Sequence, residues 1–350
     1  MPKAPWPTSS CSVSQRRASL AGFEVRRAWQ WRPMAPVYAA DTRNHRIQRF
    51  SATGSLLGAW GANGSGEGQF SSPSGIAVAP DGSVYVADTF NHRLQRFSAT
   101  GTFMGIWGSP GYGSGQFDLP IGVAIAADGT VHVADAGNNR IQRFTASGVY
   151  LGGWGYWGKD AGAFKFPADE AVGRDGSVYV ADVDNHRIQR FSATGAFLSA
   201  WGSYGSGQSQ LANPHGVAVL PADGTVYVAD TNNNRVQRFS PSGSYLGTWG
   251  SGGSGDGQFC GPRGIDIASS GTVYVAETCN HRIQRFSATG SYQGTWGTYG
   301  SGPAEFAYPL SVAAGPGGTY VADTDNNRIQ RFSATGAFLG KWGSHGGGEG

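Results

Sequence analysis

The sequence predicts an all-β fold built from repeats, and three observations carry that prediction. Two short words, V-Y-V-A-D and R-I-Q-R-F, recur with small edits in seven copies. Glycine makes up 57 of the 350 residues and falls periodically at turn positions. One acidic residue marks each copy, and the steps between these residues are 47, 47, 47, 48, 47 and 46: Asp41, Asp88, Asp135, Asp182, Asp230, Glu277 and Asp323. A period of this length suits four short strands with their turns.

The second copy shows how one repeat reads along the chain. An apolar run at 75–79 is followed by the turn P-D-G, and a second apolar run at 84–87 ends at the acidic residue. A turn separates it from 93–97, and the tight turn S-A-T-G leads to 103–107. Short apolar runs bounded by glycine, proline and asparagine are typical of strands joined by tight turns. Each repeat is therefore expected to form a four-stranded antiparallel meander.

Packing then favours a ring of such sheets. A single sheet of this kind has two apolar faces and cannot bury both alone, and a radial arrangement protects sheet edges better than an open stack does. The last strand of every copy carries a tryptophan, which is expected to pack between neighbouring sheets: Trp60, Trp107, Trp154, Trp201, Trp249, Trp296 and Trp342. The predicted architecture is a β-propeller.

The words G-I-A-V-A-P-D-G-S-V-Y-V-A-D and N-H-R-I-Q-R-F resemble those of the NHL-repeat family, over residues 37–343. The resemblance implies a propeller, usually of six blades, that serves mostly as a platform for protein or RNA partners. A minority of relatives are lyases or lactonase-like enzymes. Because this chain carries seven units, seven blades are expected, with six as the alternative.

The repeated polar residues are interpreted as structural. The D-x-x-N turn offers a carboxylate to backbone N–H groups. A histidine follows it in four copies, at His45, His92, His186 and His281, whereas the other three hold Asn139, Asn234 and Asn327. Asparagine replaces histidine poorly as a transition-metal ligand but well as a hydrogen-bonding group. No metal site or cofactor is therefore predicted, and the arginine pairs, such as Arg46 with Arg49, are expected to bond the turn aspartate.

Charge and hydropathy bear on partners. Residues 1–36 hold six basic side chains and one acidic one, so the remaining 37–350 carry 20 basic and 22 acidic side chains, a net charge of −2. A phosphate-binding surface normally shows a basic excess, which disfavours nucleic acid. No apolar run approaches the roughly 18 residues that a membrane span requires.

Residues 1–36 form an irregular segment before the propeller of 37–350. The first copy has the words of its last three strands, but V-R-R-A-W-Q-W-R-P-M-A-P stands where P-x-G-I-A-V-A-P-D-G-S is expected. Suppose that the codons of residues 25–36 are read in the frame that joins the third base of each codon to the first two bases of the next. Permitted codons then give the amino-acid sequence P-x-G-V-A-M-A-P-D-G-S. Two of these junctions do not depend on codon choice. Our hypothesis is that this segment is translated out of frame; a genuine irregular strand at 28–32 is the alternative.

Function is expected where the copies differ. The connections that enter each unit and those between its second and third strands emerge at one end, which we call the long-loop face. The insert Y-W-G-K-D-A-G-A-F-K at 156–165 lies there. Polar departures from the repeat also concentrate in units four to six, at Asp169, Glu170, His215, Arg263 and Asp266. Consecutive units are neighbours around the axis, so these side chains are expected to line one polar ligand site in the central mouth.

Two classes of function remain open on these grounds. The favoured one is a non-catalytic platform that binds a protein or a small polar ligand on the long-loop face and the central mouth. The alternative is a lyase or lactonase-like enzyme with a polar or metal site in the central channel, and RNA binding is a lesser one. The sequence shows no nucleophile elbow and no zinc-spaced cysteine or histidine pairs, so no catalytic residue is assigned.

Cys260 and Cys279 are expected to lie close enough for a disulfide. One precedes the sixth unit and the other occupies the turn of the same unit, so both emerge at the long-loop face. Closing that loop of about 20 residues would stabilise the fold by roughly 3 kcal/mol in the chain-entropy account. A bond would indicate a secreted or extracellular protein, whereas two thiols would fit the cytoplasm.

Overall fold

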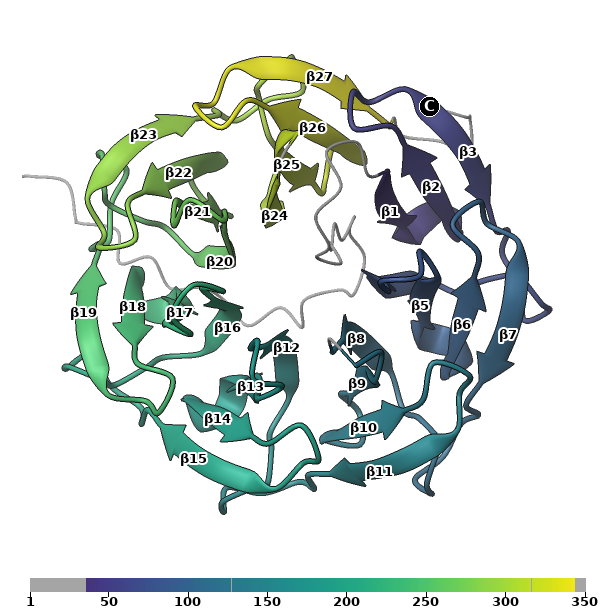
Figure 1. Cartoon of the computed structure of the whole chain (residues 1–350). Coiled ribbons are helices and arrows are strands. Elements are labelled where there is room, and N and C mark those ends of the chain that lie inside the picture. Colours follow the sequence, from purple (N-terminus) through teal and green to yellow (C-terminus); the bar gives the residue numbers. More distant parts are fainter. Residues whose placement is uncertain (1–35, 127, 316, 344–350) are drawn as a thin grey trace, which may run out of the picture.

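The computed structural model describes residues 36–126, 128–315 and 317–343, and these form seven sheets around a central axis (Figure 1). Seven blades are thus confirmed over six. Blades 2 to 7 have four strands each, and blade 1 has three among the described residues. The strand predicted at 28–32 and the out-of-frame segment 1–36 lie, except for Pro36, outside the described residues.

Each blade is an antiparallel meander whose first strand lies nearest the axis (Figure 1). Blade 1 comprises β1 (Val37–Asp41), β2 (Arg46–Phe50) and β3 (Leu56–Trp60). Blade 2 comprises β4 (Pro73–Val78), β5 (Val84–Asp88), β6 (Arg93–Phe97) and β7 (Phe103–Trp107). Blade 3 comprises β8 (Pro120–Ile125), β9 (Val131–Asp135), β10 (Arg140–Phe144) and β11 (Tyr150–Trp154). Blade 4 comprises β12 (Pro167–Val172), β13 (Val178–Asp182), β14 (Arg187–Phe191) and β15 (Phe197–Trp201).

The last three blades follow the same order. Blade 5 comprises β16 (Pro214–Val219), β17 (Val226–Asp230), β18 (Arg235–Phe239) and β19 (Tyr245–Trp249). Blade 6 comprises β20 (Pro262–Ile267), β21 (Val273–Glu277), β22 (Arg282–Phe286) and β23 (Tyr292–Trp296). Blade 7 comprises β24 (Pro309–Gly315), β25 (Gly318–Asp323), β26 (Arg328–Phe332) and β27 (Phe338–Trp342). Short 3-10 turns lie at η1 (Thr42–Asn44), η2 (Thr89–Asn91), η3 (Val183–Asn185) and η4 (Thr231–Asn233).

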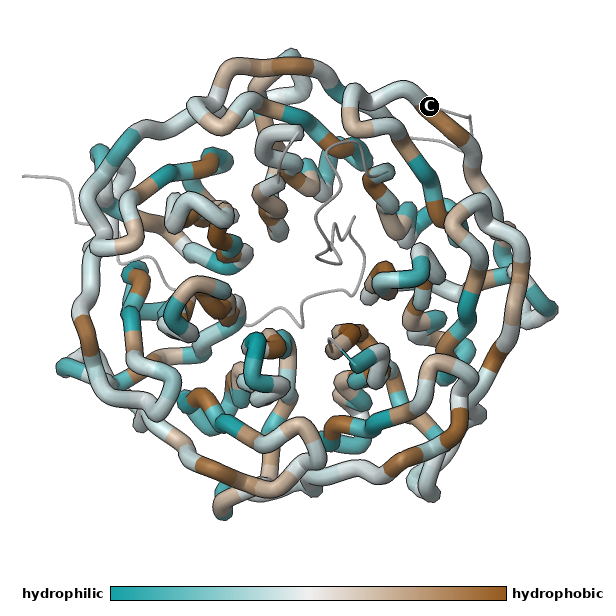
Figure 2. Tube along the Cα trace, viewed as in Figure 1, coloured by the Kyte–Doolittle hydropathy of each residue, from teal (hydrophilic) through white to brown (hydrophobic). Residues whose placement is uncertain are grey.

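The core lies between blades, as the tryptophans predicted. Trp60 packs 5.6 Å from Phe97 of the next blade and against Gly101, where an added Cβ would come within 2.5 Å of the indole. The same contact closes the ring, because Trp342 packs against Gly54 of blade 1 and the Tyr320 hydroxyl donates to the Ala52 carbonyl at 3.0 Å. Figure 2 shows hydrophobic segments recurring in every sheet, including the outermost strands.

A buried carboxylate organises the long-loop face of each blade. In blade 2, Asp88 is fully buried and accepts hydrogen bonds from Arg93 Nε at 2.7 Å and from the Ser71 backbone N–H at 2.6 Å. The Arg93 guanidinium continues to the carbonyls of Gly66 and Gln69, both at 2.8 Å. The turn carboxylate and the first arginine therefore pair as predicted, and together they hold the incoming loop through its backbone.

The second arginine of each pair was assigned the wrong partner. Arg96 bonds Asp81 of the turn between β4 and β5, at 3.0 Å, and Arg143 donates to the Ala193 carbonyl of the next blade, at 2.9 Å. The reason is strand alternation: residues three apart on a strand face opposite sides of the sheet. The two arginines therefore cannot reach the same carboxylate.

The repeated histidine or asparagine is a hydrogen-bond acceptor, which fits the structural interpretation. All seven lie in the left-handed region, and six of them accept a backbone N–H from the loop entering the next blade, at 2.9 to 3.2 Å, whereas Asn327 accepts from Arg43 Nη1 at 3.4 Å. The pairs are His45 with Ser72, His92 with Leu119, Asn139 with Phe166, His186 with Asn213, Asn234 with Gly261, and His281 with Tyr308. An imidazole that accepts through Nδ1 must be neutral.

The boundary between blades 3 and 4 departs from this plan. Elsewhere a buried tyrosine on the second strand donates its hydroxyl to a turn carbonyl, as Tyr85 does to Ala146 at 3.1 Å. Blade 3 carries His132 instead, fully buried, with neither ring nitrogen hydrogen-bonded within the described part of the chain. Burial, with the nearby Arg143 charge, lowers the pKa of His132 to about 4. The imidazole is therefore neutral at pH 7.

We expect Asp88→Ala to destabilise the propeller by about 3 to 5 kcal/mol, because it leaves the Arg93 charge buried without its carboxylate. Asp81→Ala in the same blade is the matched control: its side chain is 56% exposed, and an exposed pair contributes about 1 kcal/mol or less. Urea unfolding followed by circular dichroism measures both variants. Equal losses of stability in the two variants would contradict the role given to the buried carboxylate.

Candidate functional site

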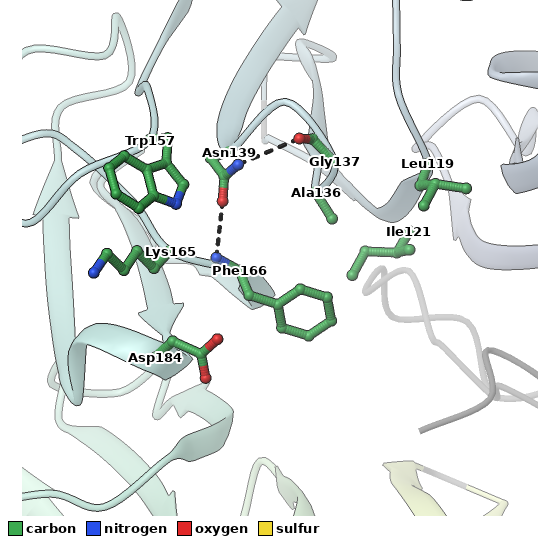
Figure 3. Close-up of a pocket in the computed structure, with 9 residues that line it drawn as sticks. All are labelled: Leu119, Ile121, Ala136, Gly137, Asn139, Trp157, Lys165, Phe166 and Asp184. Atoms are coloured by element: carbon green, nitrogen blue, oxygen red, sulfur yellow. Dashed lines mark hydrogen bonds between the residues drawn. The ribbon is translucent and has the colours of Figure 1, made fainter. Parts of the chain in front are cut away.

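A cavity of about 340 Å³ lies on the long-loop face at the boundary between blades 3 and 4 (Figure 3). Blade 3 contributes the entrance to β8 and the turn after β9, and blade 4 contributes its incoming loop and η3. The lining residues are Leu119, Ile121, Ala136, Gly137, Asn139, Trp157, Lys165, Phe166 and Asp184. The cavity is therefore bordered by apolar side chains, with one cation and one anion near its rim.

The backbone of the incoming loop sets the geometry of this cavity. Phe166 lies in the left-handed region, with φ of 55°, and its N–H donates to Asn139 Oδ1 at 3.0 Å. The neighbouring Lys165 N–H donates to the buried carboxylate of Asp182 at 2.7 Å. These two bonds fix consecutive residues, so the Phe166 ring is directed toward Ile121, as Figure 3 shows. The aromatic wall is thus positioned by the same network that recurs in every blade.

The rim of the cavity is electrostatically mixed. The Lys165 ammonium lies 4.9 Å from the centre of the Trp157 ring, within the range of a cation–π contact. Asp184 accepts a hydrogen bond from Asn213 Nδ2 at 3.2 Å, which ties it to the loop entering blade 5. A ligand here would meet an aromatic face and a cation on one side and a carboxylate on another.

Exposed aromatic side chains extend this surface around the long-loop face. Trp157, Tyr204 and Tyr299 occupy the same position in their incoming loops, each bridged to the buried residue that precedes the next strand. With Tyr112, they are between 69% and 80% exposed. Tyr204 and Tyr299 each pack in a tilted arrangement against the histidine of the preceding turn, with ring centres 4.8 Å apart. Such exposure of large rings on one face is typical of an interaction surface.

The residues predicted to line the central mouth all lie on inner strands of blades 4 to 6, and three of them contact a neighbouring inner strand. Asp169 accepts a hydrogen bond from the Val217 N–H of blade 5 at 3.0 Å, and Asp266 accepts one from the Ala314 N–H of blade 7 at 2.7 Å. Glu170 is buried, and its carboxylate lies against Gly122 of blade 3. Adjacent residues on a strand face opposite neighbours, which separates Asp169 from Glu170.

His215 and Arg263 lie on the neighbouring inner strands β16 and β20, and a Cβ added at Gly216 would meet the Arg263 carbonyl. Burial lowers the pKa of His215 to about 4, and the charge of Arg263 is the second cause. His215 Nδ1 lies 3.0 Å from the Asn213 carbonyl, so a neutral ring donates from Nδ1 and leaves Nε2 as an acceptor. None of the five predicted residues lines the cavity between blades 3 and 4. A shared ligand site in the mouth remains a prediction.

Cys260 and Cys279 are neighbours in space. The Cys279 N–H donates to the Cys260 carbonyl at 3.3 Å, and both side chains are thiols in the structure. A disulfide between them remains a prediction. Within the described ranges, no group of three or more histidine, cysteine, aspartate or glutamate side chains could hold a metal ion. No helix in those ranges is long and apolar enough to cross a membrane.

Comparison with solved structures places the fold. Virginiamycin B lyase from Staphylococcus aureus is 18% identical, with 78% of this chain and 84% of that chain covered and a TM-score of 0.60. A streptogramin B lyase is 16% identical, over 78% and 83% of the two chains, with a TM-score of 0.62. Hydrazine synthase from Kuenenia stuttgartiensis is 14% identical, over 93% and 98%, with a TM-score of 0.66. Identities this low show a shared fold.

Comparison with curated proteins found no match. The model of the NHL repeat, in contrast, matches in five places, one in each of blades 2 to 6: residues 70–97, 117–144, 164–191, 211–239 and 259–286. Each match begins at the buried residue that ends the incoming loop and finishes at the end of the third strand, so it contains the carboxylate and arginine described above. The chain belongs to the NHL-repeat β-propeller family.

Proposed function

We propose that this propeller is an interaction platform that binds a protein partner on its long-loop face, at the boundary between blades 3 and 4. The partner's anchor is a large apolar side chain that enters the cavity beside Phe166 and Ile121. The observation that carries the proposal is a cavity of about 340 Å³ with an exposed tryptophan at its rim. Tryptophan is among the residues that contribute most to binding in protein interfaces.

Charge refines the expected partner. The Lys165 ammonium lies over Trp157 and is available to a carboxylate, whereas Asp184 is already bonded by Asn213. An acidic residue next to the apolar anchor would therefore gain a cationic neighbour without displacing an existing contact. Residues 37–350 have a net charge of −2, which supports a protein rather than a nucleic-acid partner.

The second candidate function is an enzyme of the lyase or lactonase-like type. His215 is the residue that supports it. Its Nε2 is an acceptor near the central mouth, which is what a general base requires. The lowered pKa argues the other way, because a base with a pKa of about 4 is weak at pH 7. A neutral imidazole beside a guanidinium is better suited to hydrogen bonding with a bound polar group.

The platform is tested with a displayed library of random peptides selected on the whole protein. We expect Trp157→Ala to weaken the selected peptides by about 30-fold or more, the scale of an interface residue that contributes 2 kcal/mol. Leu246→Ala on β19 is the matched control, since Leu246 is also exposed, at 45%, but lies on the outer circumference. Peptides that bind Trp157→Ala as tightly as the unaltered protein would refute this site.

The protonation of His215 is tested by a nuclear magnetic resonance titration of its ring. We expect the ring to remain neutral down to about pH 5, because burial and the Arg263 charge both lower the pKa. Arg263→Gln removes the neighbouring charge and should raise that pKa toward the ordinary value of about 6.5. Titration near 6.5 in the unaltered protein would contradict a buried ring beside the Arg263 charge.

A further inference from the structure

The axis-facing edge of β1 differs from the same edge in every other blade. In blade 2, β5 lies between β6 and the inner strand β4. Within residues 36–126, 128–315 and 317–343, β1 pairs with β2 alone, and no described inner strand stands between β24 and β4. Figure 1 shows an inner strand in the blades on either side. β1 corresponds to the second strand of the other blades, such as β5. Among the described residues, blade 1 therefore presents the edge of a second strand to the axis, whereas every other blade presents its inner, first strand.

This edge has the properties of the paired strands it corresponds to. Val37, Tyr38 and Ala39 are 5% exposed or less, like the fully paired β5. Backbone groups that are buried without hydrogen bonds are costly, and an open strand edge is a template for another strand. A segment that docks here gains main-chain hydrogen bonds, and pockets for alternate side chains select its sequence.

The neighbouring blades define what the edge accepts. Inner strands begin with proline, and the third position is glycine in blades 2, 3, 5 and 6. At Gly75 an added Cβ would come within 2.5 Å of the Ile121 carbonyl, so a bulky apolar side chain there would displace the neighbouring inner strand, whereas blades 4 and 7 carry the polar residues Asp169 and Ser311 at this position. The residue after it pairs with the middle of the second strand, as Ile76 does with Val86. The edge therefore fits an extended segment of the pattern proline, any residue, glycine, apolar, alanine, apolar.

The codons that the chain permits allow such a segment in the neighbouring frame, and two of its residues do not depend on codon choice. Trp29 has one codon and every glutamine codon begins with CA, so the shifted junction of Trp29 and Gln30 must read GCA, alanine. Met34 has one codon and alanine codons begin with GC, so its junction with Ala35 must read GGC, glycine. These fall at the positions of Ala77 and Gly82 in the second unit. The other junctions permit P-x-G-V-A-M-A-P-D-G-S, which ends immediately before Val37.

We propose that the axis-facing edge of β1 is an acceptor for an inner strand with the sequence P-x-G-V-A-M-A, encoded in the neighbouring frame across the codons of residues 25–36. If the docked segment takes the register of β4 on β5, its valine lies opposite Ala39. The alanine after that valine then lies opposite Tyr38, and the methionine lies opposite Val37. The docked segment completes the fourth strand of blade 1 and stands between β24 and β4. The proposal concerns the axis and is independent of the partner site on the long-loop face.

The test compares the present chain with one in which residues 25–36 are replaced by P-S-G-V-A-M-A-P-D-G-S. We expect a higher Tm by several degrees and hydrogen exchange at least about 10-fold slower at the β1 amides that do not donate to β2, since pairing protects them. The matched control carries leucine in place of the first glycine of the replacement. The close packing seen at Gly75 leaves no room for leucine, so this version should show neither the higher Tm nor the slower exchange. Equal exchange at β1 in the present and replaced chains would overturn the acceptor, and so would equal protection by the leucine version.

Sequencing the source gene tests the encoded occupant separately. The first glycine of the segment requires G as the third base of the Arg27 codon, and its aspartate requires G as the third base of the Pro33 codon. Finding G at both positions supports the proposed strand. Any other base at either position would overturn its identity.

Discussion

The buried carboxylate at the end of the second strand is the interaction on which the rest of the structure depends. In blades 2 to 7 it joins the turn, the third strand and the incoming loop, and in blade 2 the Arg93 guanidinium carries this link to two loop carbonyls. The loop is thereby held through its backbone rather than its side chains. Side chains such as Trp157 and Tyr204 can then vary from blade to blade without loss of the fold. The repeat keeps the loops in place, and the variation between the loops would supply the proposed binding surface.

Several departures from the repeat lie at the boundary between blades 3 and 4. Between blades 3 and 4, His132 replaces a hydrogen-bonding tyrosine, Asn139 replaces a histidine, and Glu170 places a carboxylate against Gly122. The cavity lies at the long-loop end of this same boundary. Among the described residues this boundary lacks the tyrosine hydrogen bond of the others, and the aromatic wall formed by Phe166 gives the cavity an apolar side. The proposed partner would bind at the boundary where these substitutions lie.

The sequence predicted the ring, the blades and the tryptophan packing because each depends on a period that single letters reveal. It predicted the partner of the first arginine but not of the second, since the two were treated alike although residues three apart on a strand face opposite sides. The alternation that separates Asp169 from Glu170 was available from the same rule. Trp157 and Lys165 belong to an insert that stood out by composition. The cavity itself was missed, because it requires the left-handed backbone at Phe166 and its approach to Ile121 across a blade boundary.

Hydrogen exchange of the loop amides that donate to the buried carboxylates tests the central claim most directly. These amides lie in long surface loops, at Ser71, Asp118, Lys165, Ala212, Cys260 and Ala307. If the carboxylates hold the loops, these amides exchange as slowly as the core strands, because both are released by the same opening of the blade. If these amides instead exchange as fast as the exposed amides of the same loops, the loops move independently of the blades. That result would contradict the account of a fixed platform.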